Sequence, residues 1–197
     1  MAETSFGALQ TRRSFGLLFA GVAAAVCAGA VIAELAAMNK VSVYYQALIW
    51  AGAFAITFGA IYPRFRRAIP AIRGRMKNSI AWSTPAKAIN GLAWAGPFAA
   101  IGIFPHFYQY LILLGIGLGN LATYVMMKKF SHINNPEQLI VSAIALAAIP
   151  VAFVIDYSLF ISRQDIAVMI SRLLIALAYG TGAAYAFATS GMKIPDQ

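Results

Sequence analysis

Residues 88–127, AINGLAWAGPFAAIGIFPHFYQYLILLGIGLGNLATYVMM, form a stretch of 40 residues without any Asp, Glu, Lys or Arg. A helix needs about 20 mostly apolar residues to cross about 30 Å of hydrocarbon, so this stretch is too long for one membrane span and suits two. The segment Phe104-Pro105-His106 lies where a turn between the two is expected. The stretch therefore predicts a helical hairpin in a membrane, with spans at 88–104 and 107–127.

The composition of the whole chain agrees with a membrane protein. Of the 197 residues, 61% are hydrophobic and 11% are charged, and the mean hydropathy is +0.74. Soluble domains usually have about 25% charged residues, so this chain has too few charges to cover a soluble surface. The single cysteine, Cys27, also has no partner for a disulfide within the chain. A soluble domain, a disordered chain and a disulfide-stapled secreted module are excluded.

The rest of the chain consists of similar apolar runs separated by short polar segments. Open β-sheet is excluded in lipid because the backbone groups at its edges would lack hydrogen bonds, and the runs lack the alternation of a membrane β-barrel. The sequence therefore predicts an all-α integral membrane protein, a single transmembrane domain over 1–197 built as a six-transmembrane-helix bundle with short loops. The expected spans are 14–38, 41–63, 88–104, 107–127, 138–160 and 165–189, with a basic cytoplasmic loop at 64–87.

The positions of the basic residues predict the orientation. If the N-terminus is cytoplasmic, only Lys40 and Arg163 lie outside, and Arg172 lies in the last span. The other twelve cations lie inside: Arg12, Arg13, Arg64, Arg66, Arg67, Arg73, Arg75, Lys77, Lys87, Lys128, Lys129 and Lys193. Cytoplasmic loops collect Lys and Arg, so both termini are expected in the cytoplasm and the protein in a plasma (inner) membrane. Orientation explains the net charge of +9, and no nucleic-acid partner is expected.

The N-terminal segment has an alternative interpretation. The sequence Thr11-Arg12-Arg13-Ser14-Phe15-Gly16-Leu17 resembles a twin-arginine export motif, and Ala28-Gly29-Ala30 could be a cleavage site. The apolar run is longer than the usual signal core of 7–15 residues, which favours a retained first span whose inner end is held by the two arginines. Cleavage would leave five spans with unchanged loop positions.

Apart from Asp165, the first residue of the last span, the expected spans contain three charged residues, all near the outer boundary: Glu34, Asp156 and Arg172. Such residues are costly in a membrane and are functional candidates by default. One interpretation is a structural ion pair between Asp156 and Arg172 that fixes the last helical hairpin. The other is an outer vestibule in which these three residues and His106 bind a substrate or an ion. No His/Glu pair at i, i+3 or i, i+4 predicts a metal site.

The basic segment between the second and third spans interleaves cations with Phe65, Ile69, Ile72 and Met76. Such a segment can lie on the cytoplasmic leaflet, with its apolar side chains in the interface and its cations on anionic headgroups. The headgroup-contact candidates are Arg64, Arg66, Arg67, Arg73, Arg75 and Lys77. The alternative, which is compatible, is a loop that only sets the orientation.

Small residues at helical spacing predict contacts between helices, because close packing in lipid needs small side chains. The second span carries Ala51, Ala55 and Gly59 at i, i+4 and i+8, and the fourth carries Gly115, Gly119 and Thr123 at the same spacing. Both stripes are therefore expected in helix–helix contacts.

These features favour a transporter or channel-like protein for a small solute or an ion, acting alone or as a homo-oligomer. The alternative is a non-catalytic subunit or assembly factor of a larger membrane complex. An enzyme is the least supported class, because the sequence has no phosphate-binding loop, no paired zinc ligands and no Cys-x-x-Cys motif. The sequence does not indicate a cofactor.

Overall fold

The computed structural model describes residues 5–42, 44–77 and 82–191, and Lys193 lies outside these ranges. The described residues form seven α-helices and no strand, so the all-helical prediction is confirmed. The helices are α1 (Ser5–Met38), α2 (Tyr44–Ala60), α3 (Tyr62–Lys77), α4 (Thr84–Ala100), α5 (Tyr108–Ser131), α6 (Pro136–Val154) and α7 (Gln164–Ser190). A short 3₁₀ helix (Pro105–Phe107) precedes α5, and a π-helical turn (Ile155–Leu159) follows α6.

Four helical segments are long and apolar enough to cross a membrane: Leu9–Met38, Pro105–Ser131, Pro136–Leu159 and Gln164–Ser190. Together α2 and α3 form a fifth candidate, but the two helices are bent by 91° at their junction. The described helices thus provide four to five candidate spans, fewer than the six expected from the sequence. Helices α2 and α4 are short, with 17 residues each, and α4 also contains Lys87, Asn90 and two prolines.

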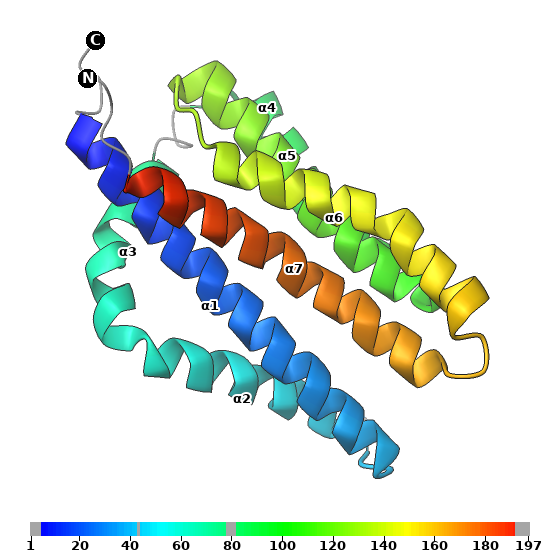
Figure 1. Ribbon diagram of the computed structural model, residues 1–197. Helices are drawn as coiled ribbons and strands as arrows, with labels where there is room; N and C mark the ends of the chain where they lie inside the picture. The colour runs from blue at the N-terminus through cyan, green and yellow to red at the C-terminus, as the bar shows by residue number, and fades with distance from the viewer. Residues whose placement is uncertain (1–4, 43, 78–81, 192–197) are drawn as a thin grey trace.

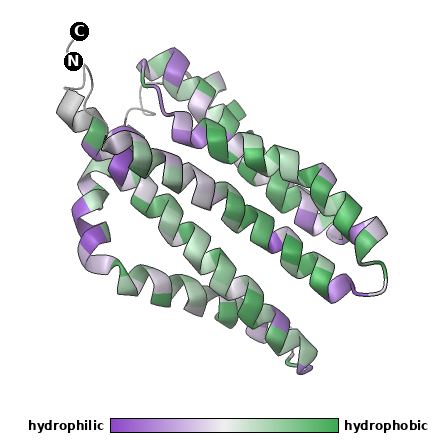
Figure 2. Ribbon diagram, in the orientation of Figure 1, coloured by the Kyte–Doolittle hydropathy of each residue, from purple (hydrophilic) through white to green (hydrophobic). Residues whose placement is uncertain are grey.

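The surface is apolar along the helices and polar toward their ends. Figure 2 shows hydrophobic residues through the middle of α1, α2, α5, α6 and α7, whereas hydrophilic residues gather on α3 and in the turn between α6 and α7. Large apolar side chains are widely exposed, as at Leu48, Ile56, Leu92 and Ile103. Exposed apolar side chains along the helices are compatible with a protein embedded in a membrane.

The first and last helices form the centre of the bundle. Helix α1 packs most extensively on α7, the other side of α7 contacts α6, and α5 lies between α6 and α4 (Figure 1). The start of α1 and the end of α7 lie at the same end of the molecule. Gly16 allows this close approach, because a Cβ there would come within 3.1 Å of Ala186. The chain therefore closes by pairing its first helix with its last.

Helix α3 occupies much of the segment that was expected to be a loop. It turns away from α2 and reaches the end of the bundle where α1 begins (Figure 1). Its buried residues are Ala68, Ile72 and Arg75, which share one face at i, i+4 and i+7, while most of its cations are exposed. This amphipathic pattern explains why a basic segment forms a packed helix.

Of the two stripes of small residues, one contacts another helix and the other does not. A Cβ at Gly119 would lie 2.3 Å from the Trp94 ring, so the expected stripe on α5 contacts α4, as predicted. The stripe on α2 is exposed at Ala51, Ala55 and Gly59, and a Cβ at Gly59 would meet nothing within 4 Å. The described part of the chain therefore leaves the α2 stripe uncovered.

Candidate functional site

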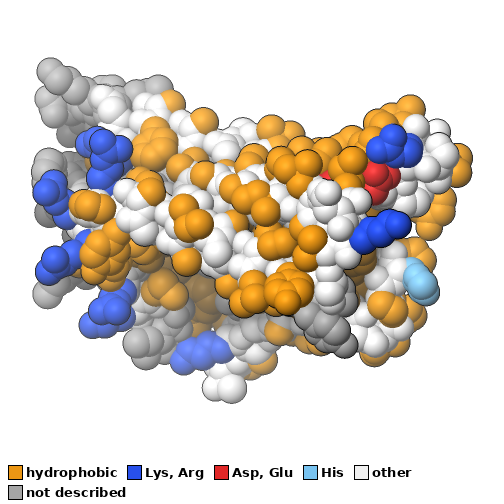
Figure 3. All heavy atoms as spheres, turned by 90° about the horizontal axis from the view of Figure 1, so that it is seen from below, with side chains coloured by type: hydrophobic (Ala, Val, Ile, Leu, Met, Phe, Trp, Pro, Cys, Tyr) orange, Lys and Arg blue, Asp and Glu red, His pale blue; other side chains and the backbone are white. Residues whose placement is uncertain are grey.

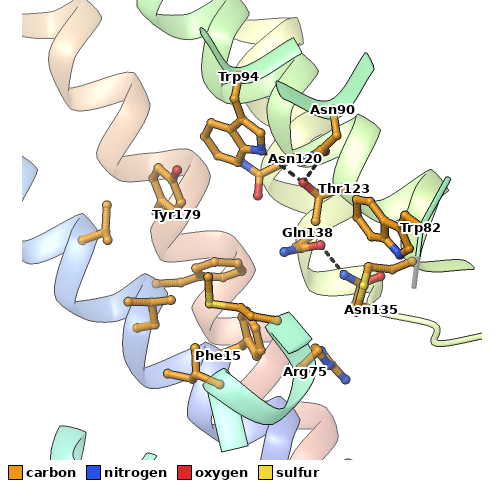
Figure 4. Close-up of a pocket in the computed structure, with 16 residues that line it drawn as sticks. Phe15, Arg75, Trp82, Asn90, Trp94, Asn120, Thr123, Asn135, Gln138 and Tyr179 are labelled. Carbon is orange, nitrogen blue, oxygen red and sulfur yellow. Dashed lines mark hydrogen bonds between the residues drawn. The ribbon is translucent and has the colours of Figure 1, made fainter. Parts of the chain in front are cut away.

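A chamber of about 380 Å³ lies inside the bundle, toward the end where α1 begins and α7 ends (Figure 4). Side chains from α1, α3, α4, α5, α7 and the start of α6 line it. Its walls are largely aromatic: Phe15, Phe19, Trp82, Trp94 and Tyr179. Its polar groups are mostly uncharged: Arg75, Asn90, Asn120, Thr123, Asn135 and Gln138. Small-molecule sites have this character, a concave apolar surface with a few placed polar groups.

The wall formed by α4 and α5 is held by hydrogen bonds around Thr123. Trp94 Nε1 donates to Thr123 Oγ1 over 3.1 Å, and the Thr123 hydroxyl lies 2.9 Å from Asn90 Oδ1 and 2.8 Å from the Gly119 carbonyl oxygen. On the same face of α5, Asn120 Nδ2 donates to the Ile116 carbonyl oxygen over 2.9 Å. These bonds fix the Trp94 ring and present Asn90 and Asn120 to the chamber (Figure 4).

The start of α6 supplies a second polar wall. Asn135 precedes the helix and donates from Nδ2 to Gln138 Oε1 (Figure 4). Asn135 is fully buried, and its Oδ1 receives no hydrogen bond from the described residues. A buried polar atom without a partner costs about 1–3 kcal/mol, so this oxygen makes the start of α6 a costly part of the fold.

Beside this wall lies a buried ion cluster centred on Glu137, whose side chain is 0% exposed. Arg75 Nη1 of α3 donates to Glu137 Oε1 over 2.8 Å, and Arg12 Nε of α1 lies 3.8 Å from Oε2. The Arg75 guanidinium also lies 5.0 Å from the centre of the Phe15 ring. Buried charges must be paired to be tolerated, so this cluster ties α1 and α3 to the start of α6.

The placement of Arg75 departs from the sequence-based expectation. Contact with lipid headgroups was predicted for it, but its side chain is only 4% exposed because Glu137 draws it inward. The other headgroup candidates remain on the surface: Arg64, Arg66, Arg67, Arg73 and Lys77. The prediction is therefore corrected for Arg75 alone.

At the opposite end of the bundle, the expected ion pair between Asp156 and Arg172 does not form. The ion pairs found between described residues join Glu137 to Arg12 and Arg75, and Asp165 to Arg163, and they include neither Asp156 nor Arg172. Asp156 Oδ2 instead accepts from Gln109 Nε2 (2.8 Å) and the Tyr110 hydroxyl (2.5 Å). The prediction was wrong because neutral donors from α5 reach this carboxyl group.

The other residues expected in the outer vestibule are only partly brought together. Arg172 is half-buried, with its guanidinium 5.7 Å from the centre of a Trp50 ring, and Glu34 is buried within the electrostatic reach of Arg172. His106 is exposed in the 3₁₀ helix, and no contact between it and a carboxyl group is found among the described residues. The described residues hold no group of three His, Cys, Asp or Glu side chains placed to bind a metal.

The chamber escaped sequence reasoning because its polar residues carry no charge. Spacing was the available signal: Asn90 and Trp94 are at i, i+4, whereas Asn120 and Thr123, like Asn135 and Gln138, are at i, i+3. Each pair therefore shares one face of a helix or helix start. Uncharged polar pairs in or beside apolar spans would have indicated an internal site.

The arrangement defines a class of protein, a helical membrane-embedded protein with an internal chamber of aromatic and amide side chains. Comparisons with protein families, curated proteins and solved structures give no match to this chain. The chamber has groups that can bind and orient a small molecule, through hydrogen bonds from its amides and stacking on its aromatic rings.

Proposed function

We propose that this chain is a six-span membrane transporter that binds a small solute in the chamber. Helices α2 and α4 serve as the two short spans, since 17 residues extend about 25 Å at 1.5 Å per residue. The common end of α1 and α7 supports an even number of spans. The contact between Arg12 and Glu137 supports α1 as a retained span rather than a removed signal.

In the proposed orientation the protein lies in the plasma membrane and both termini lie in the cytoplasm. Figure 3 shows several Lys and Arg side chains gathered at one end of the molecule. On α3, the bend of 91° would lay the helix along the inner leaflet, with its exposed cations on anionic headgroups. A reporter-fusion topology assay tests this: neutralising Arg64, Arg66 and Arg67 should weaken the inside position, and an unchanged topology would count against it.

The chamber is the observation that carries the transport proposal. Polar side chains inside a membrane protein are costly unless they are satisfied, and the side chains of Asn90, Asn120 and Gln138 all line the chamber. A purely structural bundle would be more stable with apolar residues at Asn90, Asn120 and Gln138. Their presence around one cavity is expected of a site that takes a solute out of water.

Solute flux in proteoliposomes tests the proposal. The purified full chain is reconstituted, and vesicle swelling is followed with urea, glycerol, acetate and methylammonium as neutral, anionic and cationic probes. At least one probe should enter faster than into empty vesicles, and Asn120→Leu should slow that entry about tenfold. The matched control Asn39→Leu alters an exposed amide at the other end of α1 and should leave entry unchanged. Entry equal to that of empty vesicles for all four probes would contradict the proposal.

A second candidate, a subunit of a larger membrane complex, is favoured by the uncovered stripe on α2. Small residues in membrane helices normally lie against another helix, yet Ala55 and Gly59 face outward and nothing lies near a Cβ built at Gly52 or Gly59. Purification in mild detergent tests this candidate. A stoichiometric partner or second copy should be lost with Gly59→Leu and kept with the control Ile56→Leu. A wild-type chain that purifies as a lone monomer would exclude it.

A further inference from the structure

We infer that the chamber takes a neutral, flat solute whose edge carries a hydrogen-bond donor beside an acceptor, as in a carboxamide or a nucleobase. This inference rests on the proposed function, because it names the class of solute for the same site. It is carried by the charge of the lining, by the free polar atoms and by the shape of the walls.

The lining offers no free counter-charge. Arg75 is the only charged residue among the described residues that line the chamber, and its guanidinium is bonded to the buried Glu137. No described Asp or Glu side chain lines the cavity. A charged solute would lose its hydration without gaining an unpaired opposite charge, which is strongly unfavourable in a low-dielectric site. A neutral solute avoids this cost.

The polar atoms left over after internal bonding include both donors and acceptors. The Gln138 carbonyl oxygen accepts from Asn135, which leaves its amide N–H groups for a ligand. The Asn120 amide nitrogen donates to the backbone of α5 and is in hydrogen-bond contact with the Tyr179 hydroxyl, which leaves the Asn120 carbonyl oxygen as an acceptor. Figure 4 shows Asn120 and Gln138 beside the same space, so one amide-like edge could meet both the donor and the acceptor.

The walls favour a flat body of modest size. Trp94, held on the wall of α4 and α5 by its hydrogen bond to Thr123, and Tyr179 on α7 provide aromatic surface around the space (Figure 4). Flat rings gain from stacking on such surfaces beyond the area they bury. A volume of about 380 Å³ lies at the lower end of the range for ligand sites, which limits the solute to a small molecule.

Three probes with the same ring and different charge test the class: 2-naphthamide, 2-naphthoate and 2-naphthamidine. Binding to the full chain in nanodiscs is measured by equilibrium dialysis, with empty nanodiscs subtracted. 2-Naphthamide should bind at least tenfold more tightly than the other two. Tighter binding of 2-naphthoate would overturn neutrality and point to Arg75, whose Nε lacks a hydrogen bond among the described residues. Equal binding of all three, or binding of none, would also overturn the inference.

Variants locate the binding in the chamber. Gln138→Met keeps the length of the side chain and should weaken 2-naphthamide binding about tenfold, since it removes the donor and leaves the ligand carbonyl unpaired. Asn39→Met is the matched control and should bind like wild type. Unchanged binding by Gln138→Met, with unchanged thermal unfolding, would place the probe elsewhere and overturn the inference. The two proposals fail separately: selective binding without flux refutes transport, whereas flux of charged probes alone refutes the neutral class.

Discussion

The two ends of α6 each carry a buried carboxyl group, and the two groups are held in opposite ways. Glu137 lies in the first turn and is paired with two arginines from α1 and α3. Asp156 lies just past the last turn and is held by an amide and a phenol from α5. The helix dipole favours an anion at the first position and disfavours it at the second. The ion pairs of Glu137, called the clamp below, join the start of α6 to the distant helices α1 and α3. The hydrogen bonds that Asp156 accepts from uncharged donors, called the latch below, join the end of α6 to the neighbouring helix α5.

The largest expected effect comes from removing the charge at the clamp. Glu137→Gln leaves Arg75 buried without a countercharge and should lower the free energy of unfolding by about 3–5 kcal/mol. Equilibrium unfolding in mild detergent measures this. The control Asp165→Asn breaks an exposed pair with Arg163 and should cost less than about 1 kcal/mol. Similar losses in both variants would mean that the cluster is not a clamp.

The latch should respond more weakly. Tyr110→Phe removes one of the two donors to Asp156 and should cost about 1–2 kcal/mol in the same unfolding measurement. Tyr157→Phe is the matched control, because its side chain is exposed and stacks on Phe153 without a recorded hydrogen bond among the described residues. A loss as large as that of Glu137→Gln would erase the distinction between the two ends.

The smallest effect is expected when both clamp partners are replaced. Glu137→Leu combined with Arg75→Met leaves neither charge buried alone, and the partly exposed Arg12 can turn to water. The double variant should recover most of the stability lost in Glu137→Gln and unfold within about 1 kcal/mol of wild type. A double variant that is as unstable as the single one would show that α3 needs the ion pair itself.

The sequence predicted helices well where apolar length decided the outcome. The uncharged stretch 88–127 contains most of α4 and α5, separated at Pro105 as expected. The sequence did not predict that α3 is a packed helix, because the many cations of this segment hide the narrow buried face at Ala68 and Ile72. The charge and hydropathy of a single segment are local properties, and they predict local structure such as a helix.

Contacts between distant segments could not be predicted from these local properties. Arg75 and Glu137 are 62 residues apart, and nothing in either local segment selects the other. At Asp156 the two candidate partners, Arg172 and the donors on α5, could be separated only by knowing which helix face each presents. The chamber could not be predicted from the positions of charged residues, because Asn120 and Gln138, which lie in or beside the apolar runs, are uncharged.

The pairing of α1 with α7 has a consequence for biosynthesis. Chains emerge N-terminus first, so α1 enters the membrane long before its main packing surface has been made. Arg75 likewise waits for Glu137 until α6 is synthesised. Until α7 is synthesised, the face of α1 at Gly16 lacks the helix against which it packs. A chain that stops before α7 therefore leaves this face of α1 uncovered.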